Sequence, residues 1–190
     1  MSANKNIFQI KIILKYVKPP IWRRFLVEDN IKLPDLHKVI QTIMGWSDTH
    51  LHQFISQERF YGVSSEDLYG ETIDYKKIKL KDILKYENEK IKYEYDFGDG
   101  WEHEIILEKV FKNETIEKPI CLAGRRNCPP EDCGGPYGYM NMLKALSDQK
   151  NKDYEEYRSW IGDDFDSEYF DKELINILLG RKNYGSFSIL

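Results

Sequence analysis

The feature that most constrains the fold is a pair of alternating segments joined by a tight-turn tripeptide in the middle of the chain. Residues 91–97 alternate Ile, Tyr, Tyr and Phe with Lys, Glu and Asp, and residues 101–107 alternate Trp, His, Ile and Leu with mainly acidic neighbours. Gly-Asp-Gly at 98–100 separates them. Side chains two positions apart share one strand face, and Asp-Gly is a common hairpin turn. The sequence therefore predicts an antiparallel hairpin with one buried face.

The remainder of the chain adds further strands and several amphipathic helices. Pro19-Pro20 interrupts an alternating segment that resumes at Trp22, which predicts a second hairpin across a proline-bearing turn. Pro34 and Pro136 each fit the first turn of a helix, and Gly45 is placed to end the first of these. Strands are predicted at 8–16, 22–27 and 50–56, and helices at 34–44, 136–146, 154–161 and 169–179.

These elements predict one α+β domain over residues 1–190, with its core over about 7–180. We expect a mainly antiparallel sheet of about five strands, one helix packed after the first hairpin, and a helical C-terminal section. The β-β-α-β order at the start is similar to a β-grasp arrangement.

Composition limits the class of protein and its surroundings. Charged residues make up 32% and aromatic residues 14% of the 190 residues, which is typical of a globular domain. No segment has the roughly 20 apolar residues that cross a membrane, and residues 1–6 lack the apolar core of a signal peptide. Three clustered cysteines suit reduced thiols or metal ligands better than disulfides. These features predict a cytoplasmic protein without membrane contacts.

Several long motifs carry a resemblance to a known family. They are Pro19–Arg24, Met44–Trp46, His50–Phe54, Tyr93–His103 and Cys128–Tyr139. In this order they resemble the plasmid pRiA4b ORF-3-like family over almost the whole chain. The resemblance implies an accessory protein of the kind found on plasmids and mobile elements, and it implies no particular reaction.

The first chemical candidate is a zinc site. Cys121, Cys128, Cys133 and His103 offer the thiolate and imidazole ligands that zinc prefers, and a loop rich in Pro and Gly could fold the cysteines around one ion. The spacings of seven and five positions differ from the paired C-x-x-C pattern of strong zinc motifs. The alternative is that the cysteines are small buried residues of a packed loop.

The second candidate is a metal-dependent hydrolytic centre built from carboxylates and histidines, which could hold a divalent ion and activate water. Against it, Asp in an Asp-Gly turn serves the backbone, and a histidine between apolar strand neighbours can be a core residue. His50 and His52 form a further pair, predicted on one strand face, that could bind a metal or act as acid and base. The hydrolytic set is Asp96, Asp99, Glu102, His103, Glu131 and Asp132.

The third candidate is a binding surface of aromatic, guanidinium and acidic side chains, which suits a protein or nucleic-acid partner. Arg23 and Arg24 must point to opposite faces if 22–27 is a strand, so only one can join it. The net charge of −4 gives no general basic footprint for phosphates. We predict a noncatalytic binding module, with residues 121–138 and 99–103 as its working face. The binding set is Trp22, Arg24, Trp46, Asp99, Trp101, Glu131 and Asp132.

Overall fold

One large twisted sheet organises the molecule. The computed structural model describes residues 5–63 and 72–186. Eight strands follow the order β5-β4-β3-β6-β7-β1-β2-β8, and β4–β5 is the parallel pair while the other pairs are antiparallel. The strands are β1 (Asn6–Leu14), β2 (Trp22–Glu28), β3 (His52–Ser56), β4 (Arg59–Gly62), β5 (Thr72–Asp74), β6 (Lys90–Tyr95), β7 (Trp101–Lys112) and β8 (Ile120–Arg125).

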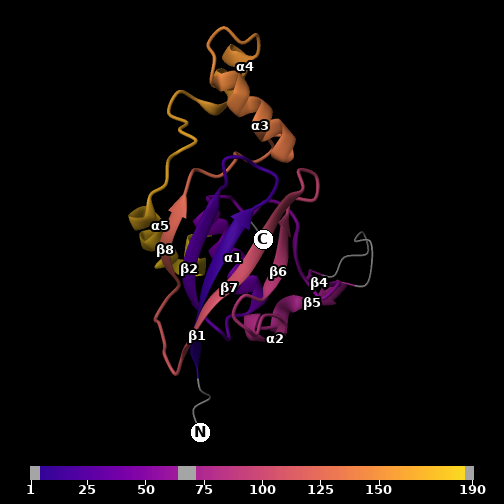
Figure 1. Cartoon of the computed structure of the whole chain (residues 1–190), viewed down its shortest axis with the longest axis vertical. Coiled ribbons are helices and arrows are strands. Elements are labelled where there is room, and N and C mark those ends of the chain that lie inside the picture. Colours follow the sequence, from indigo (N-terminus) through magenta and orange to yellow (C-terminus); the bar gives the residue numbers. More distant parts are fainter. Residues whose placement is uncertain (1–4, 64–71, 187–190) are drawn as a thin grey trace.

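Helices cover one face and one end of this sheet. The helices are α1 (Leu33–Met44), α2 (Leu80–Ile83), α3 (Gly135–Leu146), α4 (Tyr154–Ile161) and α5 (Lys172–Leu179), with short 3-10 helices η1 (Tyr75–Lys77) and η2 (Lys182–Gly185). Figure 1 shows α3 and α4 beyond one end of the strands and α5 beside β8.

Strand alternation separates a core face from an outer face. In β1, Ile10, Ile12 and Leu14 are buried, while Lys11 and Ile13 between them are partly exposed. The same alternation along β2, β6 and β7 places their buried residues on the α1 side, because paired positions of neighbouring strands share a face. Each fully buried aliphatic side chain contributes roughly 1.5–3 kcal/mol.

Helix α1 follows from an apolar stripe with clear boundaries. Leu36, Val39 and Ile40 have no exposed surface and face the sheet. Pro34 lies in its first turn, where a missing N–H costs nothing. Gly45 ends the helix in the left-handed region at φ 89°, and its N–H donates to the Gln41 carbonyl. The predicted helix over 34–44 is confirmed.

Buried Arg23 ties the end of α1 to the edge of the sheet. Its Nε donates to the Ile43 carbonyl at 2.8 Å, and its Nη1 donates to the Trp22 and Arg125 carbonyls at 2.9 Å each. A cation at the C-terminus of a helix is favoured because the free carbonyls carry negative partial charge. Arg23 and Arg24 do point to opposite faces, and Arg24 pairs with Glu108 on the outer face at 2.6 Å.

The prediction of about five antiparallel strands is wrong, because the sheet has eight strands and is mixed. The five predicted strands correspond to β1, β2, β3, β6 and β7. The missed β4 and β5 have only four and three residues, too few to show a period of two. The missed β8 begins at Ile120 and carries Gly124, so it falls in a segment whose Cys, Gly and Pro content indicates a loop.

The similarity to a β-grasp arrangement fails for a related reason. Strand β3 follows α1 in sequence but does not join β1 or β2, because β6 and β7 lie between them. The α+β class itself is consistent with the structure.

Among the described residues, no helix is long and apolar enough to cross a bilayer. The first four residues, used to argue against a signal peptide, and residues 187–190 lie outside the described ranges.

Candidate functional site

Three segments distant in sequence meet at the end of the sheet that carries α3. We define the acidic end as residues 45–52, which link α1 to β3, residues 95–103 around the β6–β7 turn, and residues 128–138, which lead into α3. The Trp46 indole N–H donates to the Pro129 carbonyl at 3.0 Å, and the Asp96 N–H donates to the Leu51 carbonyl at 2.8 Å. The cysteine-bearing loop therefore lies over the tip of the hairpin.

Gly135 permits the close approach of α3 to the hairpin tip. Its φ is 66°, and a Cβ atom there would overlap the carbonyl oxygen of Asp99. Any side chain at this position would push the loop off the hairpin, since a backbone carbonyl cannot rotate aside.

Glu131 fixes the loop to the other two segments. Its carboxylate accepts the Tyr95 hydroxyl at 2.5 Å, the Ser47 N–H at 3.3 Å and the Ser47 hydroxyl. Burial, together with the hydrogen bond to Glu131 and its negative charge, raises the pKa of Tyr95 far above its usual value. Tyr95 is therefore a donor at any ordinary pH, and Glu131 acts as an anchor of the loop.

His50 lies between two carboxylates beside this anchor. Its Nδ1 is 3.7 Å from Asp96 Oδ2, and its Nε2 is 3.5 Å from Asp132 Oδ1. The Asp96 carboxylate is held by the turn, because Oδ1 accepts the N–H groups of Gly98 at 3.0 Å and Asp99 at 3.3 Å. One atom from each of His50, Asp96 and Asp132 lies within 4.8 Å of the others.

A second histidine cluster lies deeper, beneath residues 45–52. His37 Nε2 is 2.6 Å from Asp48 Oδ1, and His37 Nδ1 is 2.8 Å from the Tyr93 hydroxyl. Gln41 donates to the same hydroxyl at 3.0 Å, and the Asp48 carboxylate accepts from His37 Nε2. These bonds hold Asp48, and with it the segment that carries His50.

His52 belongs to this deeper cluster. Its ring stacks on His37 with centroids 3.3 Å apart and planes 4° apart, and its Nε2 is 2.8 Å from the Tyr75 hydroxyl. Burial and the nearby His37 lower the pKa of His52 well below its usual range, so the ring is neutral. In-plane lone pairs of parallel stacked rings do not converge, which makes this set a structural network and a poor cradle for one ion.

The predicted pairing of His50 with His52 on one strand face is wrong, because β3 begins at His52 and His50 precedes it. The two histidines consequently enter different clusters.

The predicted binding residues separate into two places. Trp22 and Arg24 lie on the outer face of the sheet, where Lys11 and Arg24 are 5.1 and 5.4 Å from the Trp22 ring. Trp46 and Trp101 are buried inside the acidic end, with the Trp46 ring stacked on Tyr95 at 5.0 Å. Asp99, Glu131 and Asp132 complete the acidic end, so five of the seven predicted residues come together.

Within the described residues, the structure does not gather the predicted zinc set into a cluster of three or more ligands. Cys121 pairs through its backbone with Asn176, and the Cys128 thiol accepts from Arg23 at 3.6 Å. Among residues 5–63 and 72–186, neither cluster of metal-ligating groups contains a cysteine. Burial raises the pKa of Cys121 and Cys128 to about 11 and that of Cys133 to about 12. Burial lowers the pKa of His103 to about 3, so its ring is neutral.

Charge distinguishes the acidic end from the rest of the molecule. Its three segments contain Asp48, Asp96, Asp99, Glu102, Glu131 and Asp132, and no Lys or Arg, in a chain that has 28 basic residues.

Large side chains are also exposed at the acidic end. The Asp132 side chain is 77% exposed, and Leu51 and Tyr137 are 53% and 80% exposed. Leu51 and Tyr137 were not predicted as site residues from the sequence. The signal that could have pointed to these segments is their lack of Lys and Arg, which is visible in the sequence.

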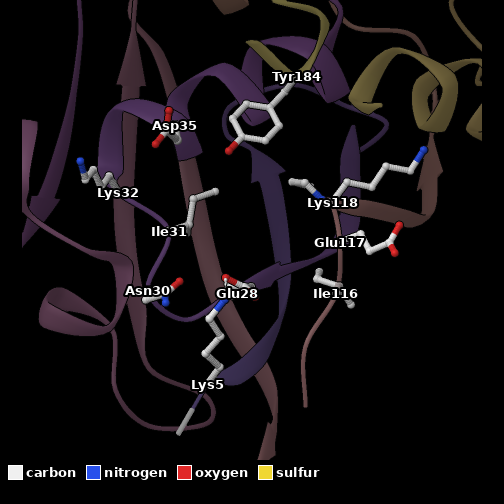
Figure 2. A pocket seen from close by; sticks show the side chains of 11 residues that line it. Lys5, Glu28, Asn30, Ile31, Lys32, Asp35, Ile116, Glu117, Lys118 and Tyr184 are labelled. Carbon is white, nitrogen blue, oxygen red and sulfur yellow. Dashed lines mark hydrogen bonds and ion pairs between the residues drawn. The ribbon is translucent and has the colours of Figure 1, made fainter. Parts of the chain in front are cut away.

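A cavity at the opposite end of the sheet differs in character. It has a volume of about 390 Å³ and is lined by three lysines and three acidic residues, with Tyr184 at its side (Figure 2). Its charges balance, and it contains none of the predicted site residues. The charged lining residues are Lys5, Lys32, Lys118, Glu28, Asp35 and Glu117.

The fold and the site define a single-sheet α+β protein with a composite acidic end. The chain belongs to the plasmid pRiA4b ORF-3-like protein family, whose profile matches residues 6–174. It is 37% identical over 164 residues to the uncharacterized protein y4hQ of Sinorhizobium fredii, covering 85% of this chain and 84% of that protein.

A solved structure has the same fold. The crystal structure of the protein of unknown function MM3350 from Methanosarcina mazei Go1 matches with a TM-score of 0.81 and 40% sequence identity. The match covers 89% of this chain and 97% of that one.

Proposed function

We propose that this protein is a noncatalytic accessory module that binds a basic segment of a partner protein at its acidic end. The observation that carries the proposal is the convergence of three segments with six carboxylates and no Lys or Arg. Such a surface attracts cationic partners and raises their association rate. An accessory role agrees with the plasmid origin in the family's name.

Charge favours a protein partner over a nucleic acid. Nucleic-acid binding draws most of its affinity from Lys and Arg on phosphates, and the acidic end would repel them. Arg24, the basic residue predicted for binding, lies on the outer face and is neutralised by Glu108 at 2.6 Å.

Exposed apolar and aromatic side chains supply contacts of the kind found in protein interfaces. Tyr137, at the first turn of α3, is 80% exposed, and Leu51, beside His50, is 53% exposed. Tyrosine is enriched among residues that dominate binding energies, and its ring can receive an arginine guanidinium. Asp132 lies in the same segment as Tyr137, residues 128–138, and offers a carboxylate to the same partner.

The burial and hydrogen bonding of the groups that a hydrolase would use support a noncatalytic role. His103 is fully buried, and its pKa of about 3 keeps it from exchanging protons near neutral pH. Glu131 is occupied by its donors from Tyr95 and Ser47. The thiol of Cys133, with a pKa of about 12, is a poor nucleophile.

Fluorescence anisotropy with a labelled arginine-rich peptide tests this proposal, with a metal chelator present throughout. We expect saturable binding that weakens as salt increases, and no binding of a glutamate-rich peptide or a single-stranded oligonucleotide. Asp132→Lys and Tyr137→Ala should each weaken binding by about fivefold or more.

Asp164→Lys is the matched control, because Asp164 is exposed and lies outside the acidic end. Equal peptide affinities of Asp132→Lys and Asp164→Lys, or tighter binding of the oligonucleotide than of the peptide, would refute the proposed function.

A further inference from the structure

His50 lies between two carboxylates that do not hydrogen-bond to it. Its two nitrogens are 3.7 Å from Asp96 and 3.5 Å from Asp132, too far for good hydrogen bonds. Bonds of about 2.0–2.2 Å to one ion put neighbouring donor atoms roughly 3–3.6 Å apart. An ion takes one of the two ring nitrogens, and one ligand atom from each of the three side chains lies within 4.8 Å of the others, so the side chains would move slightly inward on binding.

The mostly buried carboxylate of Asp96, in an acidic end without Lys or Arg, also favours a cation. Asp96 is only 8% exposed, and its Oδ1 takes both N–H groups of the turn. Among the residues that the structure describes, Oδ2 receives no hydrogen bond, and it lies 3.7 Å from His50 Nδ1. A mostly buried carboxylate charge is costly unless it is paired, and a bound cation would offset that cost.

The surroundings hold all three groups in place. The Tyr95 ring packs edge-on against His50, with centroids 5.8 Å apart at 77°. Asp132 follows Glu131, which is anchored to Tyr95 and Ser47. Ligands fixed by neighbouring hydrogen bonds lose little entropy when an ion binds.

We propose that His50, Asp96 and Asp132 bind one divalent first-row transition cation of the Zn²⁺ or Mn²⁺ class. One imidazole and two carboxylates suit these ions, whereas Ca²⁺ takes oxygen ligands. The exposed side of Asp132 leaves the remaining coordination positions to water. The inference goes beyond the proposed protein partner, because the ion occupies one corner of the acidic end and leaves Tyr137 and Leu51 free.

To test the inference, the full chain is first treated with chelator and then titrated with Mn²⁺, while electron paramagnetic resonance measures the free ion. We expect one saturable site per chain, displaced by Zn²⁺ and not by equal Mg²⁺. Asp132→Asn and His50→Ala should each weaken binding by about tenfold or more, which corresponds to about 1.4 kcal/mol. Asp164→Asn, an exposed carboxylate elsewhere, should bind the ion like the wild type.

A second measurement locates the ion. Bound Mn²⁺ should broaden the ring proton resonances of His50 before those of His103, which is buried in the sheet. Absence of a saturable site, or equal affinities of Asp132→Asn and Asp164→Asn, would overturn the metal site. The peptide assay contains chelator, so either proposal can fail without the other.

Discussion

Removal of the Tyr95 hydroxyl should loosen the acidic end while the aromatic core stays intact. Tyr95→Phe keeps the ring that stacks on Trp46 at 5.0 Å and deletes the 2.5 Å hydrogen bond to Glu131. The same change deprives the Thr49 N–H of its acceptor at 3.2 Å. The substitution is therefore close to a pure deletion of polar interactions between the three segments.

The expected cost follows from the two hydrogen bonds that this hydroxyl makes. A hydrogen bond to a charged group contributes roughly 1.5–3 kcal/mol, and Glu131 retains the donors of Ser47, which limits the destabilisation. We expect the free energy of unfolding to fall by about 2 kcal/mol. For a chain of this length that is a decrease in Tm of about 4–8 °C.

Thermal and urea unfolding followed by circular dichroism measure this destabilisation. Tyr86→Phe is the control, because Tyr86 is 73% exposed. If Tyr95→Phe unfolds at the same temperature as Tyr86→Phe, the hydrogen bonds around Glu131 do not hold the acidic end together.

Three further predictions concern the rest of the fold. Arg23→Met should cost roughly 3 kcal/mol or more, because it removes the donor of the buried Ile43 carbonyl bond and of the Arg125 carbonyl in β8. Arg24→Met should cost about 1 kcal/mol or less, and urea unfolding of the two variants compares them. Asn176→Ala should expose the β8 edge, because the Asn176 amide accepts from the Cys121 N–H at 2.8 Å and donates to the Cys121 carbonyl at 2.9 Å. An exposed strand edge can pair with another chain, so sedimentation velocity should show self-association that is absent from the wild type. The pKa of His103 is about 3 in the folded state, below its unfolded value, so the unfolded chain binds the extra proton and stability falls as pH drops from about 6.5 towards 3. Urea unfolding at pH 7 and pH 5 measures how the free energy of unfolding changes with pH. This slope should be up to about 1.4 kcal/mol per pH unit smaller in His103→Gln than in the wild type, and equal slopes would exclude this contribution.

Long alternating segments made the centre of the sheet predictable. The hairpin of β6 and β7 and the helix α1 follow from periodicity and from Gly and Pro positions, which act locally. The edge strands were not predictable in this way. Strand β8 gains its hydrogen bonds from β2, almost 100 residues earlier in the chain, and from Asn176, and no local pattern records such partners.

Only part of the site could be predicted from the sequence, for the same reason. Its residue types were visible in sequence, since Asp99, Glu131 and Asp132 stand in segments rich in Gly and Pro. Their grouping depends on interactions such as that of Tyr95 with Glu131, which only the fold creates. The cysteines illustrate the limit, because the thiols of Cys121 and Cys128 are close in sequence yet contact different neighbours.

Because the acidic end is built from three segments far apart in the sequence, it can form only after most of the chain has been synthesised. Its contributions begin at residue 45 and finish at residue 138, so a nascent chain halted between them, or a fragment cleaved there, cannot present it. Any ligand recruited there therefore selects chains that extend past residue 138. By mass action, that ligand would in turn protect them from unfolding and proteolysis.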